Sequence, residues 1–209
     1  MLYACWTVKG GSGTTVFATG LALTLASKFK HATIVDLAGD VPAVLGIAEP
    51  SGRGVRDWLA GTDRTADDLS RLTIDATSSL KVIPAGTART FDADALHDLV
   101  TALDGNVVVD LGVLQPTEEL QATIRTDWLV VRPCYLALRR ASRLAVRPRG
   151  VVVIREDGRS LTKRDVSSVV GAPVVGEVSI CGTVARSTDA GLLATRLPKR
   201  FAEEIEALL

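Results

Sequence analysis

A glycine-rich stretch near the start of the chain reads Lys9-Gly10-Gly11-Ser12-Gly13-Thr14-Thr15, directly after the apolar run Met1–Val8. The apolar run is typical of a buried strand, and the alanine- and leucine-rich segment that follows the loop predicts a helix reaching about Lys28. A glycine-rich turn between a strand and a helix lets backbone N–H groups converge on phosphate oxygens, and the helix amino end adds partial positive charge. Glycines there also serve tight strand-to-helix packing without any ligand, but Lys9 favours the phosphate-binding interpretation.

Apolar strands and helices alternate along the rest of the chain. Parallel strands need helical crossovers, so this order predicts a doubly wound, mostly parallel α/β sheet with helices on both faces. We expect residues 1–209 to form a single domain, because the chain is too short for two of ordinary size. Ligands of such sheets bind at the carboxyl ends of the strands, where the glycine loop, Asp36 and Asp110 fall. The predicted strands are Ala32–Leu37, Leu80–Ile83, Asn106–Leu111, Trp128–Val131, Val151–Ile154 and Val174–Val178, and the predicted helices include Asp92–Leu103 (capped by Asp92), Leu136–Val146 and Leu161–Val170.

The composition excludes several classes of protein. Hydrophobic residues make up 47% of the chain and charged residues 23%, which excludes disordered and fibrous proteins. Cys5, Cys134 and Cys181 are far apart and form no CxxC pair, so neither a disulfide framework nor a zinc site is indicated. Every apolar run falls short of the roughly 18 residues that a membrane span needs, and we expect a cytoplasmic protein.

The glycine loop resembles the deviant Walker A loop, K-G-G-x-G-K-T, of the MinD/ParA family of P-loop ATPases. Thr33–Asp36 is similar to the strand that leads into switch I, Val82–Gly86 to the V-L-P-A-G strand end, and Val107–Asp110 to Walker B. Val55–Gly61 and Val184–Gly191 also look like segments of the family, so the resemblance covers nearly the whole chain. It implies a P-loop NTPase-like fold, ATP and Mg²⁺ as ligands, and a homodimer.

The resemblance also implies roles for individual residues. Lys9 would reach across a nucleotide-sandwich dimer to the phosphates of the other subunit; the alternative is an ion pair with Asp36 or Asp110. The Thr15 hydroxyl and Asp110 would hold Mg²⁺, and the alternative for Asp110 is a capping role. The candidate catalytic residues are Lys9, Asp36 and Asp40, and the candidate nucleotide-binding residues are Lys9, Gly10, Gly11, Ser12, Gly13, Thr14 and Thr15.

Two departures from the family pattern predict weak nucleotide chemistry. Thr14 stands where the family has its second lysine, and a neutral hydroxyl cannot replace a full positive charge beside a polyphosphate. Ala38 stands where a second acid orients the attacking water; Asp40 either approaches the site instead or caps a helix that starts at Val41. We therefore expect the chain to hydrolyse ATP slowly or not at all. The Gly-Thr-Thr ending is similar to the CpaE/TadZ branch, whose members place pilus and secretion machinery.

A third departure concerns recognition of the base. The family often uses an Asn after the strand that ends here at Ile154, but this chain has Arg155. Arg155 either stacks on adenine or pairs with Glu156 and Asp157 in a surface turn.

Two surfaces are candidates for partner binding. On the predicted helix Leu136–Val146 and just beyond it, arginines recur at spacings of three and four, and they either bind DNA without sequence preference or form a solvated face. The C-terminal segment Pro198–Leu209 places Phe201, Ile205 and Leu208 on one helical face and acidic residues elsewhere, so we expect it to pack on the sheet. Membrane binding is disfavoured, because anionic lipid would repel that acidic face. The arginines in question are Arg139, Arg140, Arg143 and Arg147.

These observations predict a dimeric, nucleotide-dependent spatial regulator or localisation factor that docks a larger protein assembly, such as pilus or secretion machinery. Two alternatives stay open. An active ParA-like DNA-partition ATPase would need Asp40 to act on water and the arginines to hold DNA. A scaffold would keep the fold and bind no nucleotide.

Overall fold

The structure is a computed structural model that describes residues 1–156 and 158–209. Its strands are β1 (Leu2–Trp6), β2 (Ala32–Asp36), β3 (Ile74–Asp75), β4 (Leu80–Ile83), β5 (Val107–Gly112), β6 (Thr126–Val131), β7 (Gly150–Arg155) and β8 (Val174–Ser179). They form one sheet in the order β3-β4-β2-β5-β1-β6-β7-β8. Neighbours pair in parallel, except that β3 pairs antiparallel with β4 at one edge.

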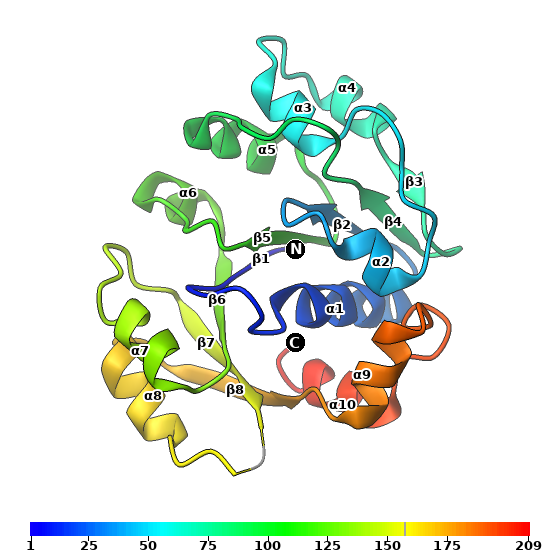
Figure 1. Cartoon of the computed structure of the whole chain (residues 1–209). Helices are drawn as coiled ribbons and strands as arrows, with labels where there is room; N and C mark the ends of the chain where they lie inside the picture. The colour runs from blue at the N-terminus through cyan, green and yellow to red at the C-terminus, as the bar shows by residue number, and fades with distance from the viewer. Residues whose placement is uncertain (157) are drawn as a thin grey trace.

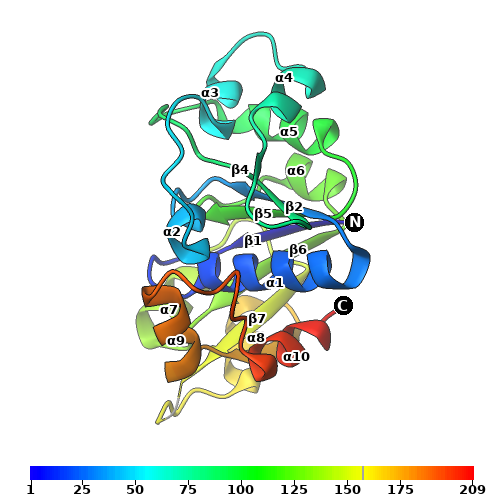
Figure 2. The same ribbon diagram turned by 90° about the vertical axis from the view of Figure 1, so that its right-hand side faces the viewer.

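Helices lie on both faces of the sheet (Figure 1), so the predicted doubly wound α/β architecture is confirmed. One face is covered by α1 (Thr14–Phe29), α2 (Val41–Leu45), α9 (Gly182–Asp189) and α10 (Lys199–Glu206). The view in Figure 2 shows α1 running along the sheet with α10 beside it. The opposite face is covered by α3 (Val55–Ala60), α4 (Ala66–Arg71), the short 3₁₀ helix η1 (Ala93–Ala95), α5 (Leu96–Ala102), α6 (Glu118–Thr123), α7 (Tyr135–Ala141) and α8 (Lys163–Val170).

The central strands are apolar on both sides because both sides are buried. In β1, Tyr3 and Cys5 pack against the face that carries α1, whereas Ala4 and Trp6 pack against the other face. Successive side chains of a strand point to opposite faces, so a strand between two helical layers reads as a continuous apolar run. β1 is therefore a central strand of the sheet, and the glycine loop follows the carboxyl end of β1.

The predicted helix Leu136–Val146 is wrong at its end, because α7 stops at Ala141. Beyond it, backbone amides bond to carbonyls only three residues back, and the chain tightens into a turn. Pro148 also disfavours helical backbone at the residue before it. Arg143 therefore lies outside the helix on which the sequence pattern placed it.

The C-terminal helix α10 packs against both α1 and the edge strand β8 of the sheet. Phe201 and Ile205 are buried against Gly20 of α1, where a Cβ atom would lie 2.8 Å from Ile205 Cδ1. Leu208, just beyond α10, lies over Gly176 of β8. The predicted packing of this apolar face on the sheet is confirmed, and α1 is its second partner. Among the described residues, no helix combines the length and the apolar character that crossing a bilayer requires.

Candidate functional site

A cavity of about 800 Å³ opens where the strand ends of β1, β2 and β5 meet. The glycine loop between β1 and α1 forms one wall of this cavity, with Gly10 to Thr15 all lining it. The loops after β2 and β4, the end of β5, and the starts or ends of α2, α3 and α9 supply the other walls. The cavity therefore lies at the edge of the sheet where parallel α/β proteins bind ligands.

The glycine loop has the backbone shape that an anion-binding turn requires. Gly11 and Gly13 have φ values of +76° and +86°, a region that side-chain-bearing residues rarely adopt. A Cβ atom at Gly13 would also lie 2.5 Å from Ile180 Cδ1, so a side chain there would be strained by the backbone and would displace the end of Ile180. Ser12 Oγ donates to the Lys9 carbonyl at 2.7 Å and closes the turn.

No side chain of the described structure caps the amino end of α1. Gly13 is its N-cap residue and provides no side chain to accept a hydrogen bond from the first turn. The first amides of a helix need partners from outside the helix, and their partial positive charge favours an anion. α1 therefore presents free N–H donors and a positive dipole end to the cavity.

Lys9 does not pair with a carboxylate in the described part of the chain. Its ammonium donates to the carbonyl of the adjacent Gly10 at 3.0 Å, on the exposed rim of the loop. The predicted alternative, an ion pair with Asp36 or Asp110, does not form among the described residues. Lys9 thus lies outside the buried part of the site.

Asp110 is fully buried at the end of β5, opposite Asp36 of β2. Its Oδ1 accepts a hydrogen bond from the Gly112 amide at 3.0 Å, while its Oδ2 is buried without a partner in the described structure. Burial raises the pKa of Asp110 to about 7, and the negative charges of Asp36 and Asp40 add to this, whereas the nearby Thr15 hydroxyl and the hydrogen bond from the Gly112 amide lower it. Asp110 thus has one oxygen available and a strong need for a positive partner.

Thr14 and Thr15 lie beside this carboxylate at the start of α1. The Thr14 hydroxyl is buried and, like Asp110 Oδ2, has no partner in the described structure. The Thr15 hydroxyl lies close enough to Asp110 to lower the pKa of that carboxyl group. Oxygen atoms of a carboxylate and a hydroxyl are the donors that Mg²⁺ prefers, so the residues present fit the ATP and Mg²⁺ that the sequence resemblance implies.

Asp36 organises the loop that follows β2. Its Oδ1 accepts hydrogen bonds from the amides of Ala38 (3.0 Å) and Gly39 (2.6 Å), and its Oδ2 accepts one from Val41 (3.1 Å). Burial raises the pKa of Asp36, and the three amides partly oppose this. Both oxygens are occupied, which leaves Asp36 a positioning role in this structure.

Asp40 is exposed and lines the cavity. It occupies the N-cap position of α2, as one of the two sequence interpretations expected, but its side chain makes no capping hydrogen bond. Its carboxylate is therefore available to the cavity, and the sequence alternative of approaching the site stays open to it.

Two arginines of the cavity wall are missing from the sequence-based site. Arg56 of α3 donates to the carbonyls of Leu37 (2.9 Å) and Ala38 (3.0 Å), which fixes the loop after β2. Arg89, in the loop after β4, is exposed and lines the same cavity. The one available signal was position, because Arg89 follows a predicted strand end at which ligands of such sheets bind.

Arg155 is held by the C-terminal helix. It donates to Glu204 Oε1 of α10 at 2.8 Å and to the Ser179 hydroxyl. The expected pairing with Glu156 is wrong, because Glu156 pairs with Arg159 at 2.8 Å. The other expected partner, Asp157, lies outside the described residues.

The four arginines of the predicted DNA surface do not form one helical stripe. Arg140 donates to the Val8 carbonyl at 3.2 Å and Arg147 to the Val170 carbonyl at 2.9 Å, so both are engaged with backbone groups. Arg139 and Arg143 are exposed. The helical spacing on which the prediction relied is thus interrupted after Ala141.

Neither a protein-family model nor a curated protein matches the chain. Several solved structures, in contrast, are similar to this chain over nearly its whole length. A ParA family ATPase from Chlorobium tepidum TLS has a TM-score of 0.75 at 19% identity and covers 99% of this chain and 98% of that one. A chain of the MinC:MinD cell division protein complex from Aquifex aeolicus has a TM-score of 0.78 at 18% identity, covering 99% and 93%.

MinD complexed with Mg-ADP from Pyrococcus horikoshii OT3 has a TM-score of 0.75 at 17% identity, again covering 99% of this chain and 93% of that one. At such identities the likeness concerns the fold. This chain has the fold of the MinD/ParA-type P-loop ATPases.

Proposed function

We propose that this chain is a nucleotide-dependent spatial regulator of the MinD/ParA type. In this proposal it binds ATP with Mg²⁺, hydrolyses it slowly or not at all, and docks a larger assembly as a homodimer in the cytoplasm. The fold shared with MinD and ParA structures supports the general class, and the Mg-ADP complex of one of them supports the choice of ligand. The Gly-Thr-Thr ending of the loop supports a role near pilus or secretion machinery.

One observation carries the proposal. Two buried oxygens, Asp110 Oδ2 and Thr14 Oγ1, have no partner in the described structure. They accompany the amino end of α1, which no side chain of residues 1–156 and 158–209 caps. A buried polar group without a partner costs about 1–3 kcal/mol, so such groups normally gather where a ligand completes them. A phosphate and its magnesium ion would satisfy the amides, the hydroxyl and the carboxylate together.

The residues have separate roles in this proposal. The loop amides and the amino end of α1 bind and orient the phosphates, and Thr15 and Asp110 would hold Mg²⁺. Bound Mg²⁺ supplies the charge neutralisation that phosphoryl transfer needs. Asp36 holds the loop after β2 in place, so that Asp40 faces the cavity. Asp40 is the carboxylate that remains to orient water, and Ala38 offers none, which supports slow hydrolysis.

Isothermal titration of the purified chain with ATP, with and without Mg²⁺, tests nucleotide binding. We expect binding that Mg²⁺ strengthens in the wild type and that Asp110→Asn makes insensitive to Mg²⁺. Asp75→Asn, an exposed carboxylate on the edge strand β3, is the matched control and keeps the response. No heat at millimolar ATP would favour the scaffold alternative, whereas tight binding with steady phosphate release would favour a partition ATPase.

Self-association tests the role of Lys9. Its ammonium bonds only to the neighbouring Gly10 carbonyl in the described structure, so it is free to exchange that contact for a phosphate of a partner subunit. A charge-assisted contact of this kind contributes about 1.5–3 kcal/mol. We expect Lys9→Ala to weaken ATP-dependent dimerisation in sedimentation velocity by about tenfold or more. Equal dimerisation of the variant and the wild type would remove Lys9 from the interface.

A further inference from the structure

Within one subunit, the described glycine loop presents no cation to the interior of the cavity, because Lys9 lies on its exposed rim. Thr14 contributes a neutral hydroxyl at the position where the related loop has a lysine. The terminal phosphates of a nucleoside triphosphate carry most of its negative charge, and uncharged amides neutralise only part of it. If the site binds ATP, a cation from another segment of the same subunit would add to the charge that a second subunit brings through its own Lys9.

Four charged side chains line the cavity: Arg56, Arg89, Asp40 and Asp189. The two carboxylates repel phosphate, which increases the need for a cation. Arg56 is half-buried and committed to the carbonyls of Leu37 and Ala38 through one of its terminal nitrogens. Arg89 is exposed and forms no hydrogen bond or ion pair with any described residue. Its guanidinium is therefore the uncommitted cation of this wall.

The backbone immediately before Arg89 is held firmly. Asp57 Oδ2 accepts hydrogen bonds from the amides of Gly54 and Thr87, each at 2.8 Å. Asp57 Oδ1 accepts from the Ala88 amide at 3.0 Å and from the Thr87 hydroxyl at 2.8 Å. Burial would raise the pKa of Asp57, but these hydrogen bonds outweigh it and lower the pKa, so the carboxylate stays charged at neutral pH. We call this set of hydrogen bonds from Asp57 to Gly54, Thr87 and Ala88 the Asp57 clamp.

Glycines allow this close approach of α3 to the loop after β4. Gly86 has φ +82°, and a Cβ atom there would overlap Asp57 Oδ2 and come within 2.7 Å of the Gly54 Cα. The chain entering α3 and the loop after β4 are thus in direct backbone contact, with Val55 N donating to Pro84 O at 2.8 Å.

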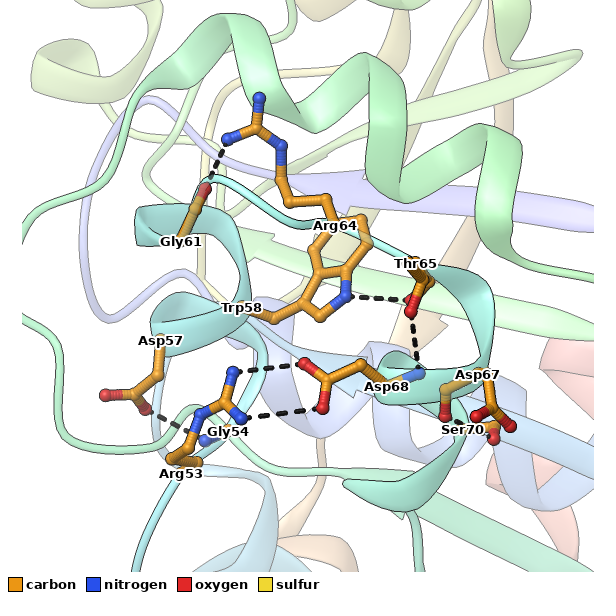
Figure 3. Close-up of polar contacts among 10 residues, drawn as sticks. All are labelled: Arg53, Gly54, Asp57, Trp58, Gly61, Arg64, Thr65, Asp67, Asp68 and Ser70. Carbon is orange, nitrogen blue, oxygen red and sulfur yellow. Dashed lines mark hydrogen bonds and ion pairs between the residues drawn. The ribbon is translucent and has the colours of Figure 1, made fainter.

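The element that carries Asp57 is itself braced. Figure 3 shows Asp57 turned toward Gly54, while Arg53 reaches Asp68 at 3.1 Å and Trp58 donates to the Thr65 carbonyl at 3.0 Å. These contacts tie α3 to the start of α4 and limit motion of α3 relative to its surroundings. Arg89 therefore directly follows a backbone segment that Asp57 holds at the cavity wall.

We infer that Arg89 supplies the positive charge for the terminal phosphates of the nucleotide that Thr14 does not provide. This inference rests on the proposed nucleotide-binding function and names a further residue of the same site. A guanidinium offers paired N–H donors that match two phosphate oxygens, and it stays charged at any physiological pH. Asp57 acts as a positioning residue, because it fixes the backbone from which Arg89 reaches the cavity.

Equilibrium binding of Mg·ATP and of AMP to the full chain tests the inference. Because a hydrogen bond to a charged group contributes substantially to binding, Arg89→Ala should weaken Mg·ATP binding by about tenfold or more. AMP lacks the terminal phosphates, and its affinity should change by less than about threefold. Arg89→Lys should retain part of the Mg·ATP affinity. Arg71→Ala, an exposed arginine on α4 that pairs only with Asp67 in the described structure, is the matched control and should change neither.

A second substitution tests whether a lysine at position 14 can replace the positive charge of Arg89. Thr14→Lys should strengthen Mg·ATP binding and should reduce the loss caused by Arg89→Ala, because one cation then compensates for the other. Equal Mg·ATP affinities of Arg89→Ala and wild type, or an equal loss for AMP and Mg·ATP, would overturn the inference and leave the proposed function intact. A wild type that binds no nucleotide would overturn both.

Discussion

Burial raises the pKa of Asp110 from 3.8 to about 7, and this single carboxyl group gives the chain a pH-dependent stability. A proton bound more tightly in the folded state than in the unfolded state stabilises the fold at low pH. The contribution is complete below about pH 4 and is lost as the pH rises through 7. The difference corresponds to roughly 4 kcal/mol at most. Asp110 is thus unfavourable for stability at the pH at which it would bind a cation.

We expect Asp110→Asn to remove this pH dependence, because an amide does not ionise. Urea unfolding from about pH 5 to about pH 8 should show a decline in free energy of unfolding for the wild type that is absent or smaller in the variant. Asp75→Asn, an exposed carboxylate on the edge strand β3, is the control and should follow the wild type. A variant that loses stability as steeply as the wild type would show that Asp110 titrates normally.

At the scale of elements, the pairing of α3 with the loop after β4 depends on one carboxylate. Asp57→Ala would leave the amides of Gly54, Thr87 and Ala88 without their partner, at a cost of about 1–3 kcal/mol in free energy of unfolding. Chemical denaturation measures this loss, and hydrogen exchange of the Thr87 and Ala88 amides should accelerate beyond the global change. Asp67→Ala on α4, whose partner is the exposed Arg71, is the matched control with little expected effect.

The same carboxylate has an opposite pH dependence to Asp110. The pKa of Asp57 is lowered in the folded state, so its contribution is present above its unfolded pKa of 3.8 and is lost as the pH falls through the folded value. We therefore expect the difference in stability between wild type and Asp57→Ala to shrink in acid. A stability difference between wild type and Asp57→Ala that stays constant from neutral pH down to strong acid would show that the hydrogen bonds of Asp57 do not depend on its negative charge.

Elements with a strong local pattern could be predicted from the sequence. The loop after β1, the strand that closes on Asp110 and the cap that Asp92 provides by accepting the Asp94 amide all follow from neighbouring residues. β3 has only two residues and therefore no periodicity to read. The end of α7 could not be predicted, because the spacing of arginines continues past the point where the backbone turns.

The candidate site likewise contains residues that could be predicted from the sequence and residues that could not. The glycine loop and Asp110 are recognisable by residue type and position. The occupation of Asp36 by three amides depends on the path of the next five residues, which periodicity does not describe. Arg89 lies in the loop after β4, three strands from β1 in the sheet, so its place in the same cavity as the glycine loop follows only from the strand order and from the hydrogen bonds of Asp57 to this loop.

At the scale of the whole molecule, α1 links the phosphate-binding loop to the C-terminal helix. Its amino end opens on the cavity, and its middle contacts Phe201 and Ile205 of α10 at Gly20. α10 in turn binds Arg155 and the Ser179 amide through Glu204. The close packing at Gly20 therefore joins the first and last helices, and α10 in turn contacts β7 and the edge strand β8.

Gly20→Ala tests how strictly that packing is set. Alanine at a helix interior normally adds about 0.5–1 kcal/mol of stability relative to glycine. Here the new Cβ would lie 2.9 Å from Phe201 Cζ and overlap Cε1, and the Phe201 ring is too buried to move away. Overpacking costs about 1–3 kcal/mol, so we expect net destabilisation in urea unfolding.

Two further variants test whether the contact with Phe201 causes the destabilisation by Gly20→Ala. Gly182→Ala in α9 adds the same methyl group where the nearest atom is the flexible end of Arg186 at 3.1 Å, and it should be neutral or stabilising. Phe201→Leu removes both ring atoms that the methyl group introduced by Gly20→Ala would touch, so the double variant should be more stable than the sum of the two single changes predicts. Strictly additive losses would show that α1 and α10 are not coupled at Gly20.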